Sequence, residues 1–288
     1  MARSLQSAPM PELPEVETLR RDLEAHVLGA TIRHVTVTGK RSVRRQRPAE
    51  LSAQLEGRRL AHVQRFGKYL VVALDPGRSW LVCHLRMSGR LQLARSGGEV
   101  LAPHTHVRLD LGRAGELRFV DPRTFGELFV TEELDARGRP RALADLGPDV
   151  LSEEIDLVRL ATLAARRQSA IKSFLLDQRV LAGIGNLYAD EICHVARLRP
   201  TRAAASLRRG DLVRLIERAR EVFEAAVGAR GSTLADGGYG DLFGRPGRFQ
   251  LEHAVYGRAG QPCRSCGSAI ELVRIAGRSS HFCPSCQH

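Results

Sequence analysis

Short apolar runs of the strand type fill the first half of the chain, and helical periodicity dominates the second half. Between residues 31 and 130, β-branched and aromatic residues recur in runs that turn residues such as Asp75-Pro76-Gly77 separate. These runs predict strands at 32–38, 59–66, 69–74, 80–85, 106–111 and 117–120. Successive strands without intervening helices are typical of a β-sandwich or a barrel.

Helical spacing appears at the start of the chain and again beyond residue 150. Val16, Leu19, Leu23 and Val27 predict a helix that begins just after Pro11. Further helices are expected at 155–165, 171–176, 187–195 and 211–227, and the apolar stripe of the last one indicates core packing. The Arg-, Gly- and Pro-rich segment 133–149 is interpreted as a linker, and the glycine-rich segment 231–249 as a mobile loop.

The charge balance points to a polyanionic partner. The 288-residue chain has 44 basic and 32 acidic side chains, a net charge of +12, and neutralised phosphates release condensed counterions. A ribosome-associated or merely basic protein is the alternative. No stretch approaches the roughly 18 apolar residues of a membrane span, so no membrane partner is expected.

Only Lys40, Lys68 and Lys172 are lysines, which suggests positions where a titratable primary amine is wanted.

The last part of the chain carries two CxxC pairs with sixteen residues between them. Four thiolates complete the tetrahedral shell of Zn²⁺ and leave no position for substrate, so we predict one structural zinc ion. Free thiols or a redox pair are the alternative. The predicted ligands are Cys263, Cys266, Cys283 and Cys286, whereas Cys83 and Cys193 are expected in the core.

The segment Met10-Pro11-Glu12-Leu13-Pro14-Glu15 suggests covalent chemistry. Once Met10 is removed, Pro11 presents a secondary amine that can condense with C1′ of a damaged sugar. An α-amino group has a pKa near ~8, and a helix N-terminus lowers it further. Glu12 is placed to move protons. By itself, an acidic helix start with a convenient proline would be the simpler interpretation.

This block and the cysteine-rich end resemble the formamidopyrimidine-DNA glycosylase family, over nearly the whole chain from Met10 to Gln287. The resemblance implies an α+β multidomain fold: an N-terminal β-sandwich with an N-terminal helix, a central helix–two-turn–helix domain and a C-terminal four-cysteine zinc hairpin. The implied boundaries are 11–132 for the catalytic sandwich, 133–149 for the linker, 150–237 for the helical DNA-binding domain and 250–288 for the zinc hairpin.

The resemblance also implies catalytic roles. Pro11 would be the Schiff-base nucleophile and Glu12 the proton donor. Lys68, in Arg65-Phe66-Gly67-Lys68, resembles the family lysine that assists β-elimination and contacts the phosphate at the lesion. Arg258, in Tyr256-Gly257-Arg258, resembles the zinc-hairpin arginine that grips the phosphates and assists δ-elimination.

Further motifs resemble the DNA contacts of the family. Met87 together with Arg123 and Phe125 matches the trio that fills the gap left by an everted base, and Arg123 suits the acceptor edge of the orphaned cytosine. In Gly183-Ile184-Gly185-Asn186, glycines would let backbone N–H groups approach a phosphate, with Asn186 as a further donor. The remaining expected backbone contacts are Arg167, Lys172 and His104.

The implied function is base excision repair by a monomeric, bifunctional glycosylase and AP lyase. Its partner would be double-stranded DNA that contains an oxidised purine (8-oxoguanine or a formamidopyrimidine) or an abasic site, in the bacterial cytoplasm at the nucleoid. Two alternatives stay open: the endonuclease VIII branch, which excises oxidised pyrimidines, and a catalytically silent protein that binds damaged DNA. The Met87, Arg123 and Phe125 trio favours the purine branch.

Residues 1–9 strain the resemblance, because the family begins at the methionine before the proline. With Met10 attached, Pro11 is a tertiary amide and cannot form an iminium. We therefore expect that translation starts at Met10, or that residues 1–9 are an artefact of the recorded start.

Overall fold

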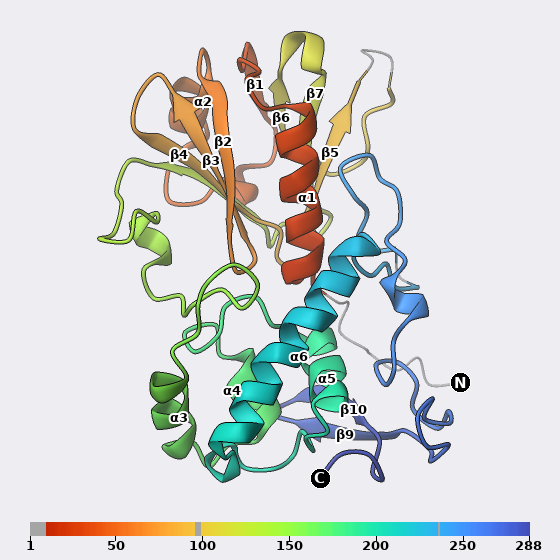
Figure 1. The fold of residues 1–288 in the computed structure, drawn as a ribbon. Coiled ribbons are helices and arrows are strands. Elements are labelled where there is room, and N and C mark those ends of the chain that lie inside the picture. Colours follow the sequence, from red (N-terminus) through yellow and green to blue (C-terminus); the bar gives the residue numbers. More distant parts are fainter. Residues whose placement is uncertain (1–9, 96–98, 236) are drawn as a thin grey trace.

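Two four-stranded antiparallel sheets packed face to face form the N-terminal half of the computed structural model, which describes residues 10–95, 99–235 and 237–288 (Figure 1). The expectation for residues 1–9 lies outside the described residues. The first sheet has the order β1 (His34–Val37), β6 (Thr105–Asp110), β7 (Glu116–Val120), β5 (Arg90–Ala94). The second has the order β2 (Arg59–Phe66), β3 (Tyr69–Asp75), β4 (Ser79–His84), β8 (Glu127–Thr131).

Alternation along the strands builds the sandwich core. In β3 the side chains of Leu70, Val72 and Leu74 face the first sheet, where Leu109 and Phe119 belong to the same buried cluster. Helix α1 (Leu13–His26) adds its apolar face to this cluster. Two strands, β5 and β8, and the short helix α2 (Pro48–Leu55) had not been expected. In α2 only Leu51 and Leu55 are buried, a pair too short to reveal helical periodicity.

The second half of the chain is helical, as expected. It contains α3 (Leu157–Ala165), α4 (Ile171–Leu176), α5 (Asn186–Val195) and α6 (Arg209–Gly228), packed around their own apolar cluster. The apolar stripe of α6 is buried throughout, which confirms its assignment to the core. Among the residues that the structure describes, no helix combines the length and apolar character needed to cross a membrane.

Part of the segment 231–249, which was expected to be a mobile loop, packs against the sandwich. Tyr239 and Leu242 join the core of the sandwich, and the Leu93 amide in β5 donates to the Leu242 carbonyl at 2.8 Å. After this segment, β9 (Glu271–Ile275) and β10 (Arg278–Phe282) form an antiparallel hairpin that lies beside α5 (Figure 1). The expected α+β fold of sandwich, helical domain and zinc hairpin is thus confirmed.

A buried ionic network joins the two halves. Arg65 at the end of β2 contacts Glu17 of α1 at 3.0 Å and binds Asp149, which precedes the helical domain, through both terminal nitrogens. Asp149 also accepts from the Gly67 amide at 2.8 Å. Because these charges are almost fully buried, they fix the β2–β3 turn against the helical half.

Candidate active site

The start of α1 lies against the start of α5. Glu12 is buried, and its carboxylate accepts from the amides of Leu187 at 2.9 Å and Tyr188 at 3.4 Å. A helix N-terminus offers such free N–H groups and favours a negative charge. We had expected these amides to face a phosphate, and this expectation is corrected: they hold Glu12.

The two glycines before α5 make this close approach possible. A Cβ at Gly185 would lie 2.2 Å from the Glu12 carboxyl carbon, and one at Gly183, whose φ is +103°, would lie 2.3 Å from Leu13. The Leu13 amide donates to the Gly183 carbonyl at 3.2 Å. Glycine at these positions therefore seats the N-terminus of α1 on the helical domain.

Glu12 sits between opposing charges. Burial raises its pKa to about 7, and the neighbouring Glu15 raises it as well, whereas Lys68 and the two amides of α5 lower it. A carboxyl group with this pKa populates both protonation states near neutral pH. Glu12 can therefore donate and accept a proton under physiological conditions.

Glu15, one helical turn further on, was not among the expected site residues. Its carboxylate accepts from the Glu12 amide at 2.9 Å, the Tyr188 hydroxyl at 2.7 Å and the Ser232 amide at 2.8 Å. Burial raises the pKa of Glu15, and these donors oppose the increase. The Glu12-x-x-Glu15 spacing is a helix-start pattern, which is the one local signal that singles out Glu15.

A small pocket of about 10 Å³ lies at this point. Pro11, Glu12 and Glu15 form one wall, and Tyr188 with Leu187 forms another. The segment after α6 covers it with Ser232, Leu234 and Tyr239. Pro11 thus adjoins two buried carboxyl groups.

Lys68, the first residue after the β2–β3 turn glycine, is 5 % exposed. Burial lowers the pKa of its ammonium group, Glu12 and Glu15 raise it, and Arg278 lowers it. A lysine with a lowered pKa is unprotonated in a larger fraction of molecules at a given pH than a solvated lysine, and only the unprotonated amine can accept a proton or act as a nucleophile. The structure places Lys68 close enough to Glu12 for the two charges to act on each other.

A cleft of about 700 Å³ opens beside these groups. The sandwich contributes Lys68, His84, Met87 and Phe125, and the helical half with its hairpin contributes Gln178, Asn186, Tyr256 and Arg278. Both sides come from one chain, and the expected contacts Met87, Phe125 and Asn186 all line it.

The Asp121 carboxylate anchors the loop that contains Arg123 and Phe125. The fully buried carboxylate of Asp121 accepts from the amides of Arg123 at 3.2 Å and Gly126 at 2.7 Å, and from the Ser88 hydroxyl next to Met87. Phe125 is 46 % exposed, with the Arg123 guanidinium 4.7 Å from its ring centre. An exposed aromatic residue on a rigid turn suits insertion into a base stack.

Two expected contacts are corrected by the geometry. Lys172 is fully buried, with Nζ 2.7 Å from Asp190 and 2.6 Å from the Ser279 carbonyl, so it cannot reach a phosphate. Arg258 does not line the cleft. Its guanidinium donates to the carbonyls of Ala254 at 2.7 Å and Pro262 at 2.9 Å, and to the Gln261 side chain at 3.2 Å.

Arg278, at the tip of the zinc hairpin, occupies the place expected for Arg258. It lines the cleft, and its charge acts on Lys68. The sequence signal that could have found it is a basic residue directly after the β-turn Ala276-Gly277. The expected contacts Arg167 and His104 are both exposed, and Arg167 pairs with Asp177 at 3.2 Å.

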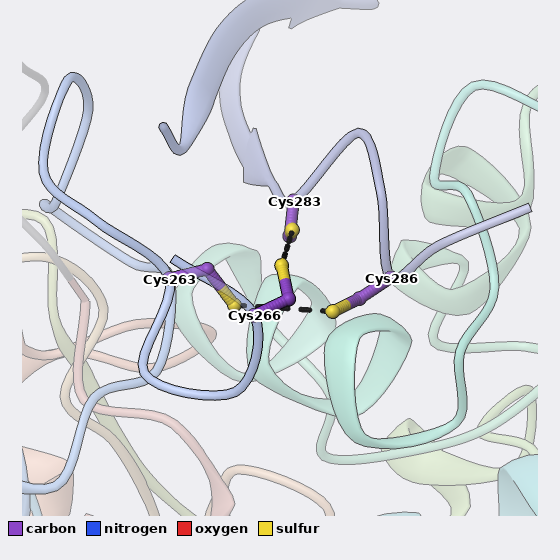
Figure 2. A group of neighbouring side chains, drawn as sticks. All are labelled: Cys263, Cys266, Cys283 and Cys286. Carbon is purple, nitrogen blue, oxygen red and sulfur yellow. Dashed lines mark hydrogen bonds between the residues drawn. The ribbon is translucent and has the colours of Figure 1, made fainter. Parts of the chain in front are cut away.

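The four cysteines of the two CxxC turns converge at the base of the hairpin (Figure 2). Their sulfur atoms all lie within 4.8 Å of one another, with 3.4 Å between Cys266 and Cys283 and 3.9 Å between Cys263 and Cys286. Four sulfurs in a tetrahedron at ~2.3 Å from one Zn²⁺ ion lie about 3.8 Å apart. The donor set and its spacing therefore fit a closed, structural zinc site.

Three family models together match most of the chain. They are the formamidopyrimidine-DNA glycosylase N-terminal domain over residues 10–128, the formamidopyrimidine-DNA glycosylase H2TH domain over 146–236, and the zinc finger found in FPG and IleRS over 260–288. A curated formamidopyrimidine-DNA glycosylase of Thermus thermophilus is 46% identical over 279 residues, which cover 96% of this chain and 98% of that protein.

Solved structures match over the same extent. The crystal structure of the MutM (Fpg) protein of Thermus thermophilus has a TM-score of 0.84 at 44% identity and covers 96% of this chain and 98% of its own. Two complexes of Lactococcus lactis Fpg cover 96% of this chain and 100% of theirs. A mutant with Fapy-dG containing DNA has a TM-score of 0.85 at 32% identity. A complex with abasic-site DNA has a TM-score of 0.84 at 31% identity.

Proposed function

The chain belongs to the formamidopyrimidine-DNA glycosylase family, and from this premise we propose that it removes oxidised purines from DNA through the secondary amine of Pro11. As a member of this family it is a DNA glycosylase of base excision repair with AP lyase activity. The assignment of Pro11 as the nucleophile is supported above all by one observation: Pro11 lines the same pocket as Glu12 and Glu15, and the pKa of Glu12 allows it to exchange a proton near neutral pH.

The reaction follows from these neighbours. The Pro11 nitrogen bonds to C1′ of the damaged nucleoside while the bond between C1′ and the base breaks. Glu12 supplies the proton that the sugar ring oxygen or the leaving base takes up. The bond between C1′ and the ring oxygen then breaks, the ring oxygen takes up a proton, and an iminium between Pro11 and C1′ remains. The iminium acidifies the C2′ proton; a base removes this proton and the 3′ phosphate leaves, and a second elimination expels the 5′ phosphate. Water finally hydrolyses the iminium and frees Pro11. Lys68, buried beside Glu12, assists these eliminations.

This chemistry requires an uncapped Pro11. The mature chain accordingly begins at Pro11 after translation from Met10 and removal of that methionine. The match to the N-terminal family model, which starts at residue 10, supports this proposal.

The cleft residues hold the DNA. Arg278 and Asn186 contact phosphates beside the lesion, while His104 and Arg167 contact the backbone further away. Met87, Arg123 and Phe125 enter the stack where the damaged base leaves it, which offsets part of the few kcal/mol that eversion costs. Bound Zn²⁺ supplies no reaction chemistry and holds the hairpin that carries Arg278. In the bacterial cell the substrate is nucleoid DNA in the cytoplasm.

The test is base release from duplexes with one defined lesion. Duplexes containing 8-oxoguanine opposite cytosine should lose the base and be cleaved on both sides of the abasic sugar. Thymine-glycol duplexes should react more slowly. A preference for thymine glycol would support the pyrimidine branch, and a gel shift without cleavage of either duplex would contradict the enzyme assignment.

A further inference from the structure

A chain of hydrogen bonds leads from Glu15 to a buried histidine that the proposed chemistry does not use. Ser232 is its central residue. The Ser232 amide donates to Glu15 at 2.8 Å, and its hydroxyl oxygen lies 3.3 Å from the Tyr188 hydroxyl and 3.1 Å from Nε2 of His253. His253 is therefore the outer end of a path that begins at the pocket beside Pro11.

The surroundings of His253 leave its ring little freedom. The side chain is 4 % exposed. It makes edge contacts with the rings of Phe249 at 5.7 Å and Tyr256 at 5.8 Å, and Phe249 in turn stacks on Tyr188 at 5.8 Å. Burial lowers the pKa of His253 to about 4, so the imidazole is uncharged at neutral pH and acts on Ser232 as a hydrogen-bond partner.

Ser232 begins the segment that covers the small pocket. Two residues later Leu234 lines this pocket, and so does Tyr239. Thr233 fastens the same segment, because its hydroxyl donates to the Tyr239 carbonyl at 3.0 Å and accepts from the Gly247 amide at 2.8 Å. The position of Ser232 therefore sets where this pocket wall stands relative to Pro11 and Glu12.

We propose that His253 is a positioning residue for base removal, because it holds Ser232, whose amide donates to the Glu15 carboxylate beside Pro11 and Glu12. This inference rests on the proposed function. Release of a base needs a proton from the carboxyl pair that Ser232 helps to hold. An abasic site has no base to release, so His253 matters for excision of the base and much less for cleavage of a strand that has already lost it.

The experiment compares these two reactions in the full processed protein. His253→Leu removes the hydrogen-bond partner and keeps a buried side chain. Single-turnover excision of 8-oxoguanine should fall about tenfold, on the scale of one neutral buried hydrogen bond. Cleavage of a preformed abasic duplex should change less than about twofold. His253→Gln, which can keep a polar nitrogen near Ser232, should restore most of the excision rate. His62→Leu, an exposed position on β2, should leave both rates unchanged.

A double-mutant cycle tests the path through Ser232. Ser232→Ala should slow excision about as much as His253→Leu, and the double variant should be no slower than either, because both changes remove one interaction. Equal losses in excision and abasic cleavage, with a lowered melting temperature, would show a merely structural role and overturn the proposal. Unchanged excision in His253→Leu, or additive losses in the double variant, would also overturn it. If the unmodified protein cleaves no abasic duplex, the proposed function itself fails.

Discussion

At the scale of single residues, burial sets the chemistry of the site. Burial has its largest functional consequence at Glu12. Desolvation destabilises the charged form of this carboxyl group in the folded protein, and this raises its pKa to about 7. Some buried charges elsewhere in the described residues are paired, as the Arg65 guanidinium is with the Asp149 carboxylate. At Glu12 the pairing is incomplete, and this supports its assignment as a proton donor.

Replacing Glu12 should separate stability from activity. The pKa of the Glu12 carboxyl rises from 4.5 to about 7 on folding, so the folded state holds this proton more tightly than the unfolded state. The resulting contribution to the free energy of unfolding is fully present below pH 4.5 and is lost as the pH rises through 7. Glu12→Gln should therefore raise the free energy of unfolding at pH 8, by up to about 3 kcal/mol, and much less at pH 5. Urea unfolding at both pH values measures this difference.

The same substitution should abolish the falling limb of the activity profile. Excision that needs protonated Glu12 should decline as the pH rises through about 7, and in Glu12→Gln the residual rate should lack this decline. An unchanged pH profile in the variant would show that another group donates the proton.

The two arginines of the hairpin region offer a matched pair. Arg278 lines the cleft, whereas the Arg258 guanidinium is occupied by carbonyl groups. Arg278→Ala should weaken binding to abasic-site DNA and reduce the slope of log Kd against log salt by about 1. Arg258→Ala should leave that slope unchanged. A slope that falls only in Arg258→Ala would contradict the placement of Arg278.

At the scale of elements, α5 organises both sides of the site. Its first amides hold Glu12, and two successive carboxylates in its middle hold the C-terminal segments. Asp190 accepts from Lys172, the Ser280 hydroxyl and the His281 amide. Glu191 accepts from three successive amides at 254–256. The hairpin that carries Arg278 is thus docked on the helix that seats Glu12.

Breaking this docking should be costly. Lys172→Met leaves Asp190 buried without its cation, a change that typically costs about 3–5 kcal/mol. We expect a loss of this size in urea unfolding and faster zinc release to a chelator. Lys40→Met, which removes a lysine at another position, is the control variant. A stability equal to that of the unmodified protein would contradict the buried pair.

Local patterns in the sequence predicted helices, strands and metal ligands better than they predicted long-range contacts between elements. The α4 range and the four zinc ligands follow from spacing alone, because each is contained in a short stretch. Tyr188 and Ser232 have no local signal, since their roles depend on Glu15 more than 170 positions away. Lys172 was expected to contact the DNA backbone because it precedes the loop 183–186. Its burial depends on Asp190 of the next helix, and such a pairing is not visible in periodicity.

At the scale of the whole molecule, the cleft exists only where the two halves are correctly oriented. Lys68 comes from the sandwich, and Arg278 from the opposite side. Arg65, Glu17 and Asp149 connect α1, the turn before Lys68 and the start of the helical half. A few buried charges therefore fix the orientation of the two halves, together with apolar packing.

Asp149→Asn should loosen this connection. One charge of the buried network is lost, and among the described residues Arg65 keeps Glu17 as its remaining anionic partner. We expect the free energy of unfolding to fall by about 3 kcal/mol. Glu154→Gln, an exposed position nearby, should change it by less than about 0.5 kcal/mol. Equal stabilities of the two variants would contradict a structural role for this network.

The most direct measurement of the central claim is borohydride trapping on an abasic duplex, with peptide mapping of the adduct. Two forms of the protein are compared, one that begins at Pro11 and one that retains residues 1–9 and Met10. We expect a covalent adduct at Pro11 in the first form and none in the second. Equal trapping of both forms, or an adduct that maps to Lys68, would contradict the role of Pro11 as nucleophile.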